Sequence, residues 1–593
     1  MSEGFNKSSN VATSALTSKI SPLLRPQVLM MLRALLASPQ RNRILFLGIA
    51  LVTIIGATAF AQIKLNAWNQ PFFDSLSRKN LGEFFAQLSV FAFIAGGLLI
   101  LKVAETWFSQ NLKVKLREGL VLDLFDEWLK PGRAFRLTNA GQIGSNPDQR
   151  IHEDARHLCE LSGDLTLGLL QASLLLGSFI GVLWFLSANV IFHFGGHRFG
   201  IPGYLVWSAL IYAGVASWLS WLVGRPLIQL NADHYAKEAD LRFALVWLNE
   251  HIDSVALYGG EGDEKQRLTV ALERVLRIMR RIVGASTRLT WITSGYGWST
   301  IVVPTLLVAP GYFGGQLSFG GLMMAVGAFN QVQQALRWFI DNFNAIADWR
   351  ATLQRIATFR EAMIAVDRVG ENEKQIEFAD SSEDKIVLEN LEVATPTGCA
   401  KLDQSKVEIG QRERVVIAGE SGAGKTILFH TIAGLWRWGT GRVKVPSGHH
   451  VMFMPRQPYV PLGTLRAALA YPSAESSQKD EELVAALGAT GLERLASSID
   501  QAARWDKDLS FDEQQLLVFT RMLLHKPHCV VIDEALDTLD DGVRKSIMNL
   551  FNDKLKDTTV INIGRLDKDS HFFKRVLRLV REPSGRCFVP DLT

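Results

Sequence analysis

Apolar residues are concentrated in the first half of the chain, where polar segments divide them into stretches of similar length. Six stretches have close to the ~20 apolar residues that a bilayer-crossing helix needs: 44–63, 84–101, 165–186, 204–223, 289–308 and 319–340. The last is the most polar of the six, because it contains Asn330, Gln331, Gln333, Gln334 and Arg337. The pattern predicts an α-helical membrane domain with six spans over residues 44–345.

The connections between the stretches differ in length and charge. Two long polar segments, about 102–164 and 224–288, are rich in Arg and Lys and have helical periodicity. We expect both to be helices that extend from the membrane on the cytoplasmic side. The first short connection, 64–83, would then be an external loop, with Trp68, Phe72 and Phe73 as a candidate aromatic anchor.

The N-terminal segment, residues 1–43, is polar and basic. Its basic residues are Lys7, Lys19, Arg25, Arg33, Arg41 and Arg43, and its one acid is Glu3. Basic residues before a first span favour the cytoplasmic side. The segment has no apolar core near its start, so we expect no cleavable signal peptide.

The pattern changes in the second half of the chain. Residues 341–385 are charged and lack long apolar runs, which predicts a helix and then a linker, with 346–385 as the linker region. From residue 386 onward, short β-like runs alternate with helical ones, as is typical of an α/β nucleotide-binding domain. We therefore expect a second domain over 386–593.

This second domain contains a phosphate-binding motif between a predicted strand, 415–418, and a predicted helix, 427–436. The motif fits G-x-x-x-x-G-K-[ST] as Gly419, Glu420, Ser421, Gly422, Ala423, Gly424, Lys425 and Thr426. Its backbone N–H groups and the helix N-terminus would surround a phosphate. Lys425 would reach the β- and γ-phosphates of ATP, and Thr426 would offer its hydroxyl to Mg²⁺.

A second apolar strand, 529–532, ends in two acids about a hundred residues later. Asp533 is placed to hold Mg²⁺ through water, and Glu534 is placed to polarise the attacking water. Such a strand is common when it occurs alone, but together with the phosphate-binding loop it predicts an ATPase.

The composition disfavours several classes of protein. The formal net charge is only +4, which disfavours a nucleic-acid binder. Apolar residues make up 48% of the chain, which is high for a soluble P-loop protein. The four cysteines have no metal-binding spacing, and the glycines between His193 and His197 make a metal site there improbable.

The run 509–515, Leu-Ser-Phe-Asp-Glu-Gln-Gln, resembles the signature of the ATP-binding cassette (ABC) transporters, and 537–540 resembles their D-loop. The resemblance implies that Ser510 and Asp512 of one subunit cap the ATP held by the other. It also implies that Gln457 contacts the metal and the water, and that Arg565 lies at the γ-phosphate. A homodimer that binds ATP and Mg²⁺ follows from it.

The likeness extends beyond the ATPase motifs, over about 60–593. Segments 146–151 and 249–260 resemble the peroxisomal fatty-acyl half-transporters, and 201–207 and 458–466 resemble their bacterial relatives. Those relatives include SbmA/BacA-like peptide importers and a mycobacterial importer of cobalamin and other hydrophilic molecules. The resemblance implies ATP-driven import of peptides, including antimicrobial ones, through a bacterial inner membrane. Import of cobalamin, of other hydrophilic solutes or of fatty-acyl compounds is an alternative.

Three positions depart from the family pattern. Asp512 replaces the signature glycine, and a carboxylate close to a γ-phosphate would repel it. Arg565 stands where the family has a histidine, and the family's Gln-Arg order is reversed as Arg456-Gln457, which leaves open which of the two faces the metal. We therefore expect a slow ATPase. A proton-driven transporter with a regulatory cassette is a further alternative, with Glu105 as candidate carrier unless it pairs with Lys102.

Overall fold

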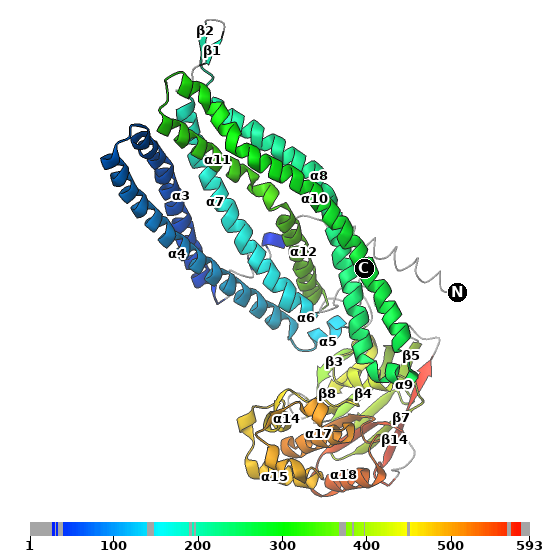
Figure 1. Cartoon of the computed structure of the whole chain (residues 1–593). Coiled ribbons are helices and arrows are strands. Elements are labelled where there is room, and N and C mark those ends of the chain that lie inside the picture. Colours follow the sequence, from blue (N-terminus) through cyan, green and yellow to red (C-terminus); the bar gives the residue numbers. More distant parts are fainter. Residues whose placement is uncertain are drawn as a thin grey trace. The chain divides into compact units, whose positions relative to one another are not determined.

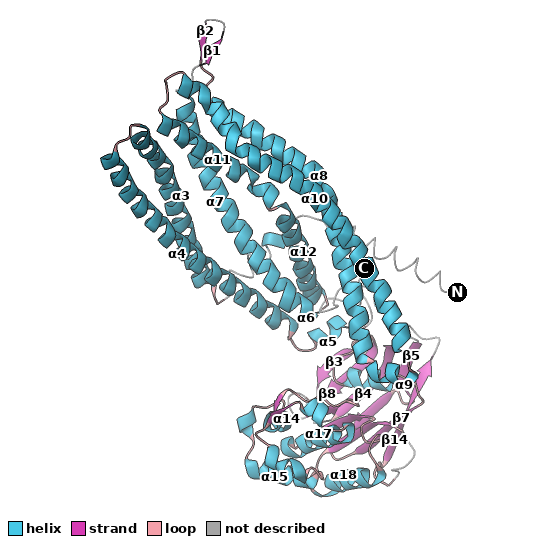
Figure 2. Cartoon of the chain, viewed as in Figure 1, coloured by secondary structure: helices cyan, strands magenta, loops and turns pink. Residues whose placement is uncertain are grey.

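The computed structural model describes residues 27–29, 31, 33, 39–138, 147–188, 192–194, 197–366, 375–381, 385–395, 398–446, 451–565 and 571–582. The chain divides into two compact units. The membrane unit comprises Lys19–Phe125 and Asn146–Thr358, and the cassette unit comprises Met1–Ser18, Asp126–Ser145 and Phe359–Thr593. The first is built from long helices and a small hairpin, and the second combines strands with helices (Figure 2).

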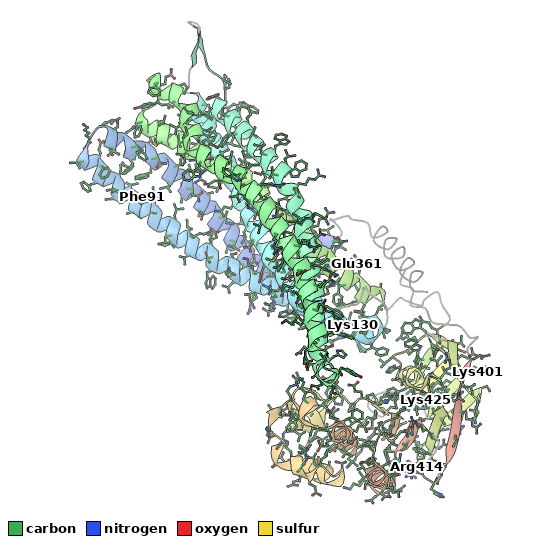
Figure 3. The ribbon with its side chains drawn as sticks, turned by 45° about the vertical axis from the view of Figure 1, so that its right-hand side comes forward. Phe91, Lys130, Glu361, Lys401, Arg414 and Lys425 are labelled. Atoms are coloured by element: carbon green, nitrogen blue, oxygen red, sulfur yellow. The ribbon has the colours of Figure 1, made fainter. Side chains whose placement is uncertain are left out.

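Five helices of the described residues are long and apolar enough to cross a membrane. They are α3 (Arg41–Ser77), α4 (Leu81–Trp128), the run Pro147–Ser187 that includes α7 (Ala155–Ser187), α8 (Tyr204–Glu250) and α10 (Glu261–Phe313). They contain the first five predicted spans. Their apolar side chains face outward to a large extent, as with Phe91 on α4, which suits a lipid environment (Figure 3).

The sixth predicted span lies in α11 (Phe319–Asp341), which is helical but is not among those five. It packs against α3, α7, α8 and α10, and its Phe329, Val332 and Gln333 are buried. Gly320 is required where α11 begins, because a Cβ there would lie 2.0 Å from the Gln70 carbonyl oxygen. The polar side chains of α11 therefore belong to a helix surrounded by other helices.

The segment expected as the first external loop is mostly helical. α3 continues to Ser77 and α4 begins at Leu81, so the expected loop 64–83 is reduced to a short turn. Trp68 Nε1 donates to the Gln87 carbonyl oxygen (2.8 Å), and the Trp68 and Phe72 rings stack at 4.4 Å. These aromatic residues join α3 to α4 and do not anchor a loop.

The polar connections form helical extensions, as the sequence predicts. α8 and α10 run side by side through segment 224–288 and are joined by the short helix α9 (Ile252–Tyr258) (Figure 1). The Tyr212 and Tyr296 rings stack between them at 4.4 Å. The other connection, 102–164, continues α4 to Trp128 and then contains α5 (Arg133–Thr138), α6 (Pro147–Gln149) and the π-helix η2 (Arg150–Asp154).

Helix α12 (Phe343–Ala365) follows α11 and is tied to the start of α7. Arg355 and Arg150 both donate to the buried Asp154 carboxylate, and His157 Nε2 lies 2.6 Å from Asp348 Oδ2. These contacts fix the position of the α7 N-terminal end within the membrane unit.

The cassette unit is built on one large sheet with the order β3-β8-β4-β5-β14-β7-β13-β12-β9, and β6 pairs with β4. The strands are β3 (Glu377–Asp380), β4 (Ile386–Thr395), β5 (Gly398–Leu402), β6 (Lys406–Ile409), β7 (Arg414–Gly419), β8 (Gly439–Val445), β9 (Val451–Met454), β12 (Cys529–Asp533), β13 (Thr559–Gly564) and β14 (Arg575–Glu582). Strands β9, β12, β13, β7 and β14 are parallel to one another, so their carboxyl ends meet at one edge.

The central parallel strands β7, β12 and β13 are buried on both faces, and successive residues of each strand point to opposite sides of the sheet. Val416 belongs to one apolar cluster, and Val415 and Ile417 belong to the other. The covering helices include α13 (Lys425–Ile432), α14 (Leu465–Ala470), α15 (Asp480–Ala489), α16 (Trp505–Asp508), α17 (Phe511–His525) and α18 (Asp541–Asp553). The Phe135 ring of α5 lies 4.8 Å from the His430 ring of α13.

Candidate functional site

The phosphate-binding motif forms the turn between β7 and α13. Gly422 (φ 82°) and Gly424 (φ 93°) adopt backbone conformations that favour glycine. Gly424 directly precedes α13, and its carbonyl oxygen accepts from the Leu428 N–H at 2.9 Å. The first N–H groups of α13 therefore remain free to face a ligand. The strand–loop–helix predicted from the sequence is confirmed, although the helix ends at Ile432 and not at the predicted residue 436.

Lys425 lies in the cassette (Figure 3) and its ammonium group faces the second predicted motif. Lys425 Nζ lies 2.8 Å from Glu534 Oε1 and 3.3 Å from the Gly419 carbonyl oxygen. Strand β13 separates β7 from β12, so this contact spans three strands at the carboxyl edge of the sheet. The structure thus brings together two motifs that are about a hundred residues apart.

The Glu534 carboxylate is held by two cations. Arg456 Nη1 lies 3.3 Å from Glu534 Oε2, whereas Lys425 contacts the other oxygen, Oε1. The hydrogen bond from Lys425 lowers the pKa of Glu534, and the charge of Arg456 adds to this effect, although partial burial opposes it. Glu534 has φ 52°, a conformation that non-glycine residues rarely adopt and that often marks functional sites.

Asp533 differs from its neighbour in its surroundings. It is 2% exposed, and burial raises the pKa of its carboxyl group. The Thr426 hydroxyl hydrogen-bonds to this carboxyl group, while Asp533 Oδ1 has no partner within the described residues. A buried oxygen of this kind needs a donor or a cation. The pair of Thr426 and Asp533 therefore fits a hard cation such as Mg²⁺.

The structure separates the two residues that the sequence left as alternatives. Arg456 contacts Glu534, whereas the Gln457 side chain is exposed and no hydrogen bond or ion pair of the described residues reaches it. The metal-contacting role expected of Gln457 stays a prediction, and Arg456 joins the candidate site on geometric grounds.

The signature residues lie at the start of α17. Ser510 caps this helix: its Oγ accepts from the Glu513 N–H (3.3 Å), and Glu513 Oε2 accepts from the Ser510 N–H (3.0 Å). Asp512 is exposed in the first turn. Within the described cassette residues, no hydrogen bond or ion pair joins Ser510 or Asp512 to the phosphate-binding loop.

A buried glutamine connects α17 to the loops around Glu534. Gln515 is 0% exposed, its Nε2 donates to the Arg456 carbonyl oxygen (3.4 Å), and its Oε1 accepts from Thr538 Oγ1 (2.8 Å). Neither Gln515 nor Thr538 is among the site residues predicted from the sequence. The sequence did contain a signal for a buried Gln515. It is a second glutamine, directly after Gln514, in a helix that must bury one of its faces.

Arg565 follows β13 at the same edge of the sheet. Its N–H donates to Asp537 Oδ2 (2.8 Å), and its side chain is exposed. Gly564 is needed for this approach, because a Cβ there would lie 2.4 Å from Asp537 Oδ2. The structure therefore places Arg565 beside the D-loop, and its γ-phosphate contact stays a prediction.

Comparisons with known proteins agree with this architecture. Residues 31–313 match the family described as ABC transporter transmembrane region 2, and residues 402–537 match the family described as ABC transporter. The chain is 26% identical to the inner membrane ABC transporter ATP-binding protein YddA of Escherichia coli, over 88% of this chain and 91% of that protein. It is 24% identical to the human lysosomal cobalamin transporter ABCD4, over 91% and 92% respectively.

A solved structure shares the fold over most of its length. A bacterial Atm1-family ABC exporter with ATP bound superimposes with a TM-score of 0.66 at 16% identity, covering 89% of this chain and 91% of that one. The two family matches together identify the chain as an ABC half-transporter, in which one helical membrane domain is fused to one ABC cassette. It is an integral membrane protein whose cassette is an ATPase coupled to transport, and its relatives include subfamily D transporters.

Proposed function

We propose that this half-transporter works as a homodimer that uses ATP to import peptides, with broad selectivity, through a bacterial inner membrane. The observation that carries the ATP-driven part is the contact between Lys425 and Glu534 (2.8 Å), which joins the phosphate-binding loop to the candidate general base. The cytoplasmic position of the cassette is supported by the basic residues before α3, and the bacterial membrane by the relative YddA.

Each candidate residue has a role in this proposal. Residues 419–424 and Lys425 hold the phosphates of ATP, and Thr426, Asp533 and Gln457 hold Mg²⁺, which neutralises phosphate charge when bound. Glu534 accepts the proton of the attacking water. Arriving phosphates compete with Glu534 for the Lys425 ammonium, so ATP binding releases the carboxylate for catalysis. Arg565 adds positive charge near the γ-phosphate but cannot relay a proton.

The site is completed by a second subunit. Ser510 and Asp512 have no contact with the phosphate-binding loop of their own described cassette, so they are available to the ATP of a partner. Two ATP molecules would then lie between two cassettes. Their binding closes the cassettes, their hydrolysis reopens them, and the membrane helices alternate access to a central cavity.

Peptide cargo rests on the resemblance to the SbmA/BacA-like importers. Cobalamin is the second candidate, because the human relative ABCD4 is a lysosomal cobalamin transporter. A fatty-acyl cargo rests on the resemblance to the peroxisomal group. Proton drive through Glu105 is disfavoured, because Lys102 Nζ lies 2.8 Å from Glu105 Oε1.

Uptake into sealed vesicles tests the proposal. Purified protein is reconstituted with its cassette facing a lumen that contains ATP, and labelled peptide, cobalamin and a labelled fatty-acyl thioester are added outside in separate reactions. We expect ATP-dependent accumulation of the peptide. The Glu534→Gln variant should bind ATP and accumulate nothing.

The other outcomes separate the alternatives. Accumulation of cobalamin or thioester without peptide would change the cargo and retain ATP drive. Uptake that survives Glu534→Gln and collapses with a protonophore would overturn ATP drive.

A further inference from the structure

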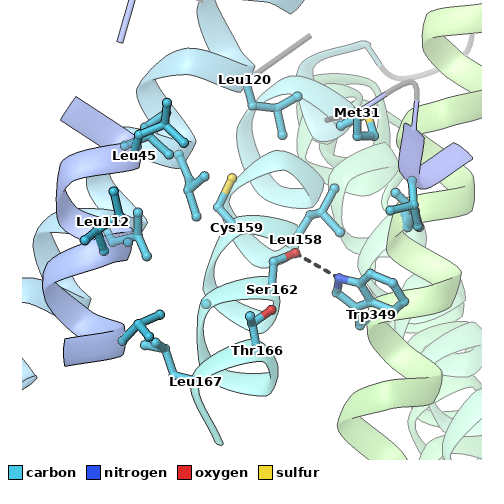
Figure 4. A pocket seen from close by; sticks show the side chains of 18 of the residues that line it. Met31, Leu45, Leu112, Leu120, Leu158, Cys159, Ser162, Thr166, Leu167 and Trp349 are labelled. Carbon is cyan, nitrogen blue, oxygen red and sulfur yellow. Dashed lines mark hydrogen bonds between the residues drawn. The ribbon is translucent and has the colours of Figure 1, made fainter. Parts of the chain in front are cut away.

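The membrane unit contains an apolar cavity that the transport cycle described above does not use. Its volume is about 630 Å³, within the range of about 300–1,000 Å³ that is usual for small-ligand sites. Its walls come from α3, α4, α7 and α12, together with Val28 and Met31 (Figure 4). All of these residues belong to the membrane unit.

The lining has almost no polar group to offer to a ligand. Leu112, Leu116 and Leu120 recur every fourth residue and present one stripe of α4 to the cavity. Two of the hydroxyl groups in the wall are already used, because Ser162 Oγ accepts from Trp349 Nε1 (2.8 Å) and Thr53 Oγ1 donates to the Ile49 carbonyl oxygen (3.0 Å). The cavity therefore suits a hydrocarbon chain and not a peptide or a sugar.

The cavity has an exposed side at the start of α3. Leu45 and Ile49 line it and are 48% and 68% exposed. These residues lie in the first turns of a helix that is long and apolar enough to cross a bilayer. A lipid chain can therefore enter sideways, at the membrane face where α3 begins.

Cations without carboxylate partners flank the apolar wall. Arg41 and Arg43 are exposed just before the lining residues of α3, and Arg117 lies on α4 within electrostatic reach of the Cys159 thiol in the wall. Among the described residues, no carboxylate forms an ion pair with any of these three arginines.

The nearby acids are already neutralised by other cations. Lys115 pairs with Glu118 (2.5 Å) and Lys113 with Asp164 (2.6 Å), and Glu160, which also acts on the Cys159 thiol, pairs with Arg156 (2.8 Å). The balance of charge around the cavity therefore favours an anion.

We propose that this cavity binds one acyl chain of an anionic phospholipid from the surrounding leaflet, with the phosphate head group attracted by Arg117, Arg41 and Arg43. The apolar stripe and the exposed side of the cavity select the chain, and the three arginines, which form no ion pair among the described residues, select the charge of the head group. The bound lipid would fill the gap between α3, α4 and α7 and stabilise the arrangement of these helices.

Photo-crosslinking tests the site directly. The full-length protein is placed in nanodiscs that contain phosphatidylglycerol with a diazirine in its acyl chain, and labelled peptides are mapped after illumination. We expect labelling of the peptides that carry Leu112–Leu120 and Leu158–Leu167. Phosphatidylcholine with the same diazirine chain should label them less.

Two glycines of α3 provide a matched pair of variants. A Cβ at Gly48 or at Gly56 meets no atom within 4 Å, but only Gly48 lines the cavity. Gly48→Phe should fill the cavity and lose most of this labelling, whereas Gly56→Phe should retain it. Gly48→Leu serves if the phenylalanine variant fails to fold. Arg117→Gln should reduce the preference for phosphatidylglycerol over phosphatidylcholine, because Arg41 and Arg43 remain.

Contrary results would overturn the proposal. Equal labelling in the two glycine variants would mean that the lipid lies on the outer surface of the helices. Equal labelling by the two head groups in the wild type would remove the role of the arginines. Displacement of the probe by an equal amount of palmitate would assign the cavity to a free fatty acid.

Discussion

At the scale of single residues, the reversed pair Arg456-Gln457 places a cation where an amide is expected. Arg456 contacts Glu534 on one side and Lys425 contacts it on the other, so both oxygens of the candidate base face positive charge. On the proposed mechanism, Lys425 leaves when phosphates arrive. Arg456 then remains as the principal cation on the base.

Removal of Arg456 should therefore change the pH dependence of ATP hydrolysis. Because the charge of Arg456 lowers the pKa of Glu534, we expect Arg456→Ala to raise that pKa. The base is then protonated at higher pH, and the acidic limb of the pH–rate profile moves to higher pH. Phosphate release measured across a pH series gives the profile.

Gln457→Ala is the matched control for this prediction, because Gln457 has no contact with Glu534 in the described residues. It should lower the rate through the metal without moving the acidic limb. A shift in Gln457→Ala and none in Arg456→Ala would assign the contact to the glutamine.

Asp512 is expected to slow ATP hydrolysis. It lies exposed in the first turn of α17, where a partner's triphosphate would approach, and two negative charges at close range repel. We expect Asp512→Asn, which retains the size of the side chain, to raise turnover by about tenfold, or ~1.4 kcal/mol of barrier. Asp512→Gly should act in the same direction.

Asp508→Asn is the control for Asp512, because it removes a nearby exposed acid outside the first turn of α17. It should leave turnover unchanged. A fall in turnover in both Asp512 variants would mean that Asp512 helps the reaction.

Much of the candidate site could be predicted from the sequence, because the glycine-rich loop and the acidic strand end are local patterns. Gly422 and Gly424 adopt the conformations that only a glycine-rich loop supplies readily. The contact of Arg456 with Glu534 and the burial of Gln515 could not be predicted, because they depend on how distant loops meet at the edge of the sheet. The spacing of residues along the chain does not show which loops contact each other.

At the scale of elements, α17 links the signature to the catalytic edge of the sheet. Gln515 has both ends of its amide bonded, one to the Arg456 backbone and one to Thr538, while Ser510 caps the same helix. A movement of the α17 N-terminus on contact with a partner's ATP would therefore reach the loops on both sides of Glu534.

Gln515→Leu should uncouple these elements. Leucine has a similar size but makes neither hydrogen bond, and the unpaired groups left behind cost about 1–3 kcal/mol of stability. We expect lower ATP turnover with unchanged ATP affinity, because the phosphate-binding loop is intact. Hydrolysis and nucleotide binding are measured on the same preparation.

Gln514→Ala on the same helix is the comparison for Gln515. Gln514 Nε2 donates to the Asp506 and Leu509 carbonyl oxygens, away from Glu534. An equal loss of turnover in both variants would show a general effect on α17 and not a specific relay.

Elements with strong periodicity were predicted well, and their ends were not. The long helices α4, α8 and α10 follow the predicted extensions, because their apolar and charged positions repeat at helical spacing. The expected loop 64–83 is wrong for most of its length, because Trp68 and Phe72 pack onto α4 and so keep α3 helical beyond the apolar stretch. That packing depends on the neighbouring helix and cannot be predicted from a single window of the sequence.

At the scale of the whole molecule, the proposal requires two chains for each site. One chain has a single phosphate-binding loop and a single signature, and the two are not in contact within the described cassette residues. A site completed in trans predicts that two differently damaged chains can restore each other. A site completed within one chain predicts that they cannot.

We therefore expect rescue in mixed dimers of Lys425→Ala and Ser510→Arg. Each variant alone lacks an intact site, because both of its sites contain the damaged part. In the mixed dimer, the loop of the Ser510→Arg chain meets the signature of the Lys425→Ala chain, which leaves one site whole. Vanadate-trapped nucleotide in co-reconstituted protein measures this site independently of turnover.

A chain that carries both substitutions, mixed with wild type, is the decisive comparison. Every site of that mixed dimer contains one damaged part, so trapping should come only from wild-type homodimers. The mixture of the two single variants has no wild-type chain at all, and any trapping above either variant alone must arise from sites shared between chains. Failure of that mixture, with mixed dimers shown by differential tags, would place the whole ATPase site in one chain and remove the reason for a dimer.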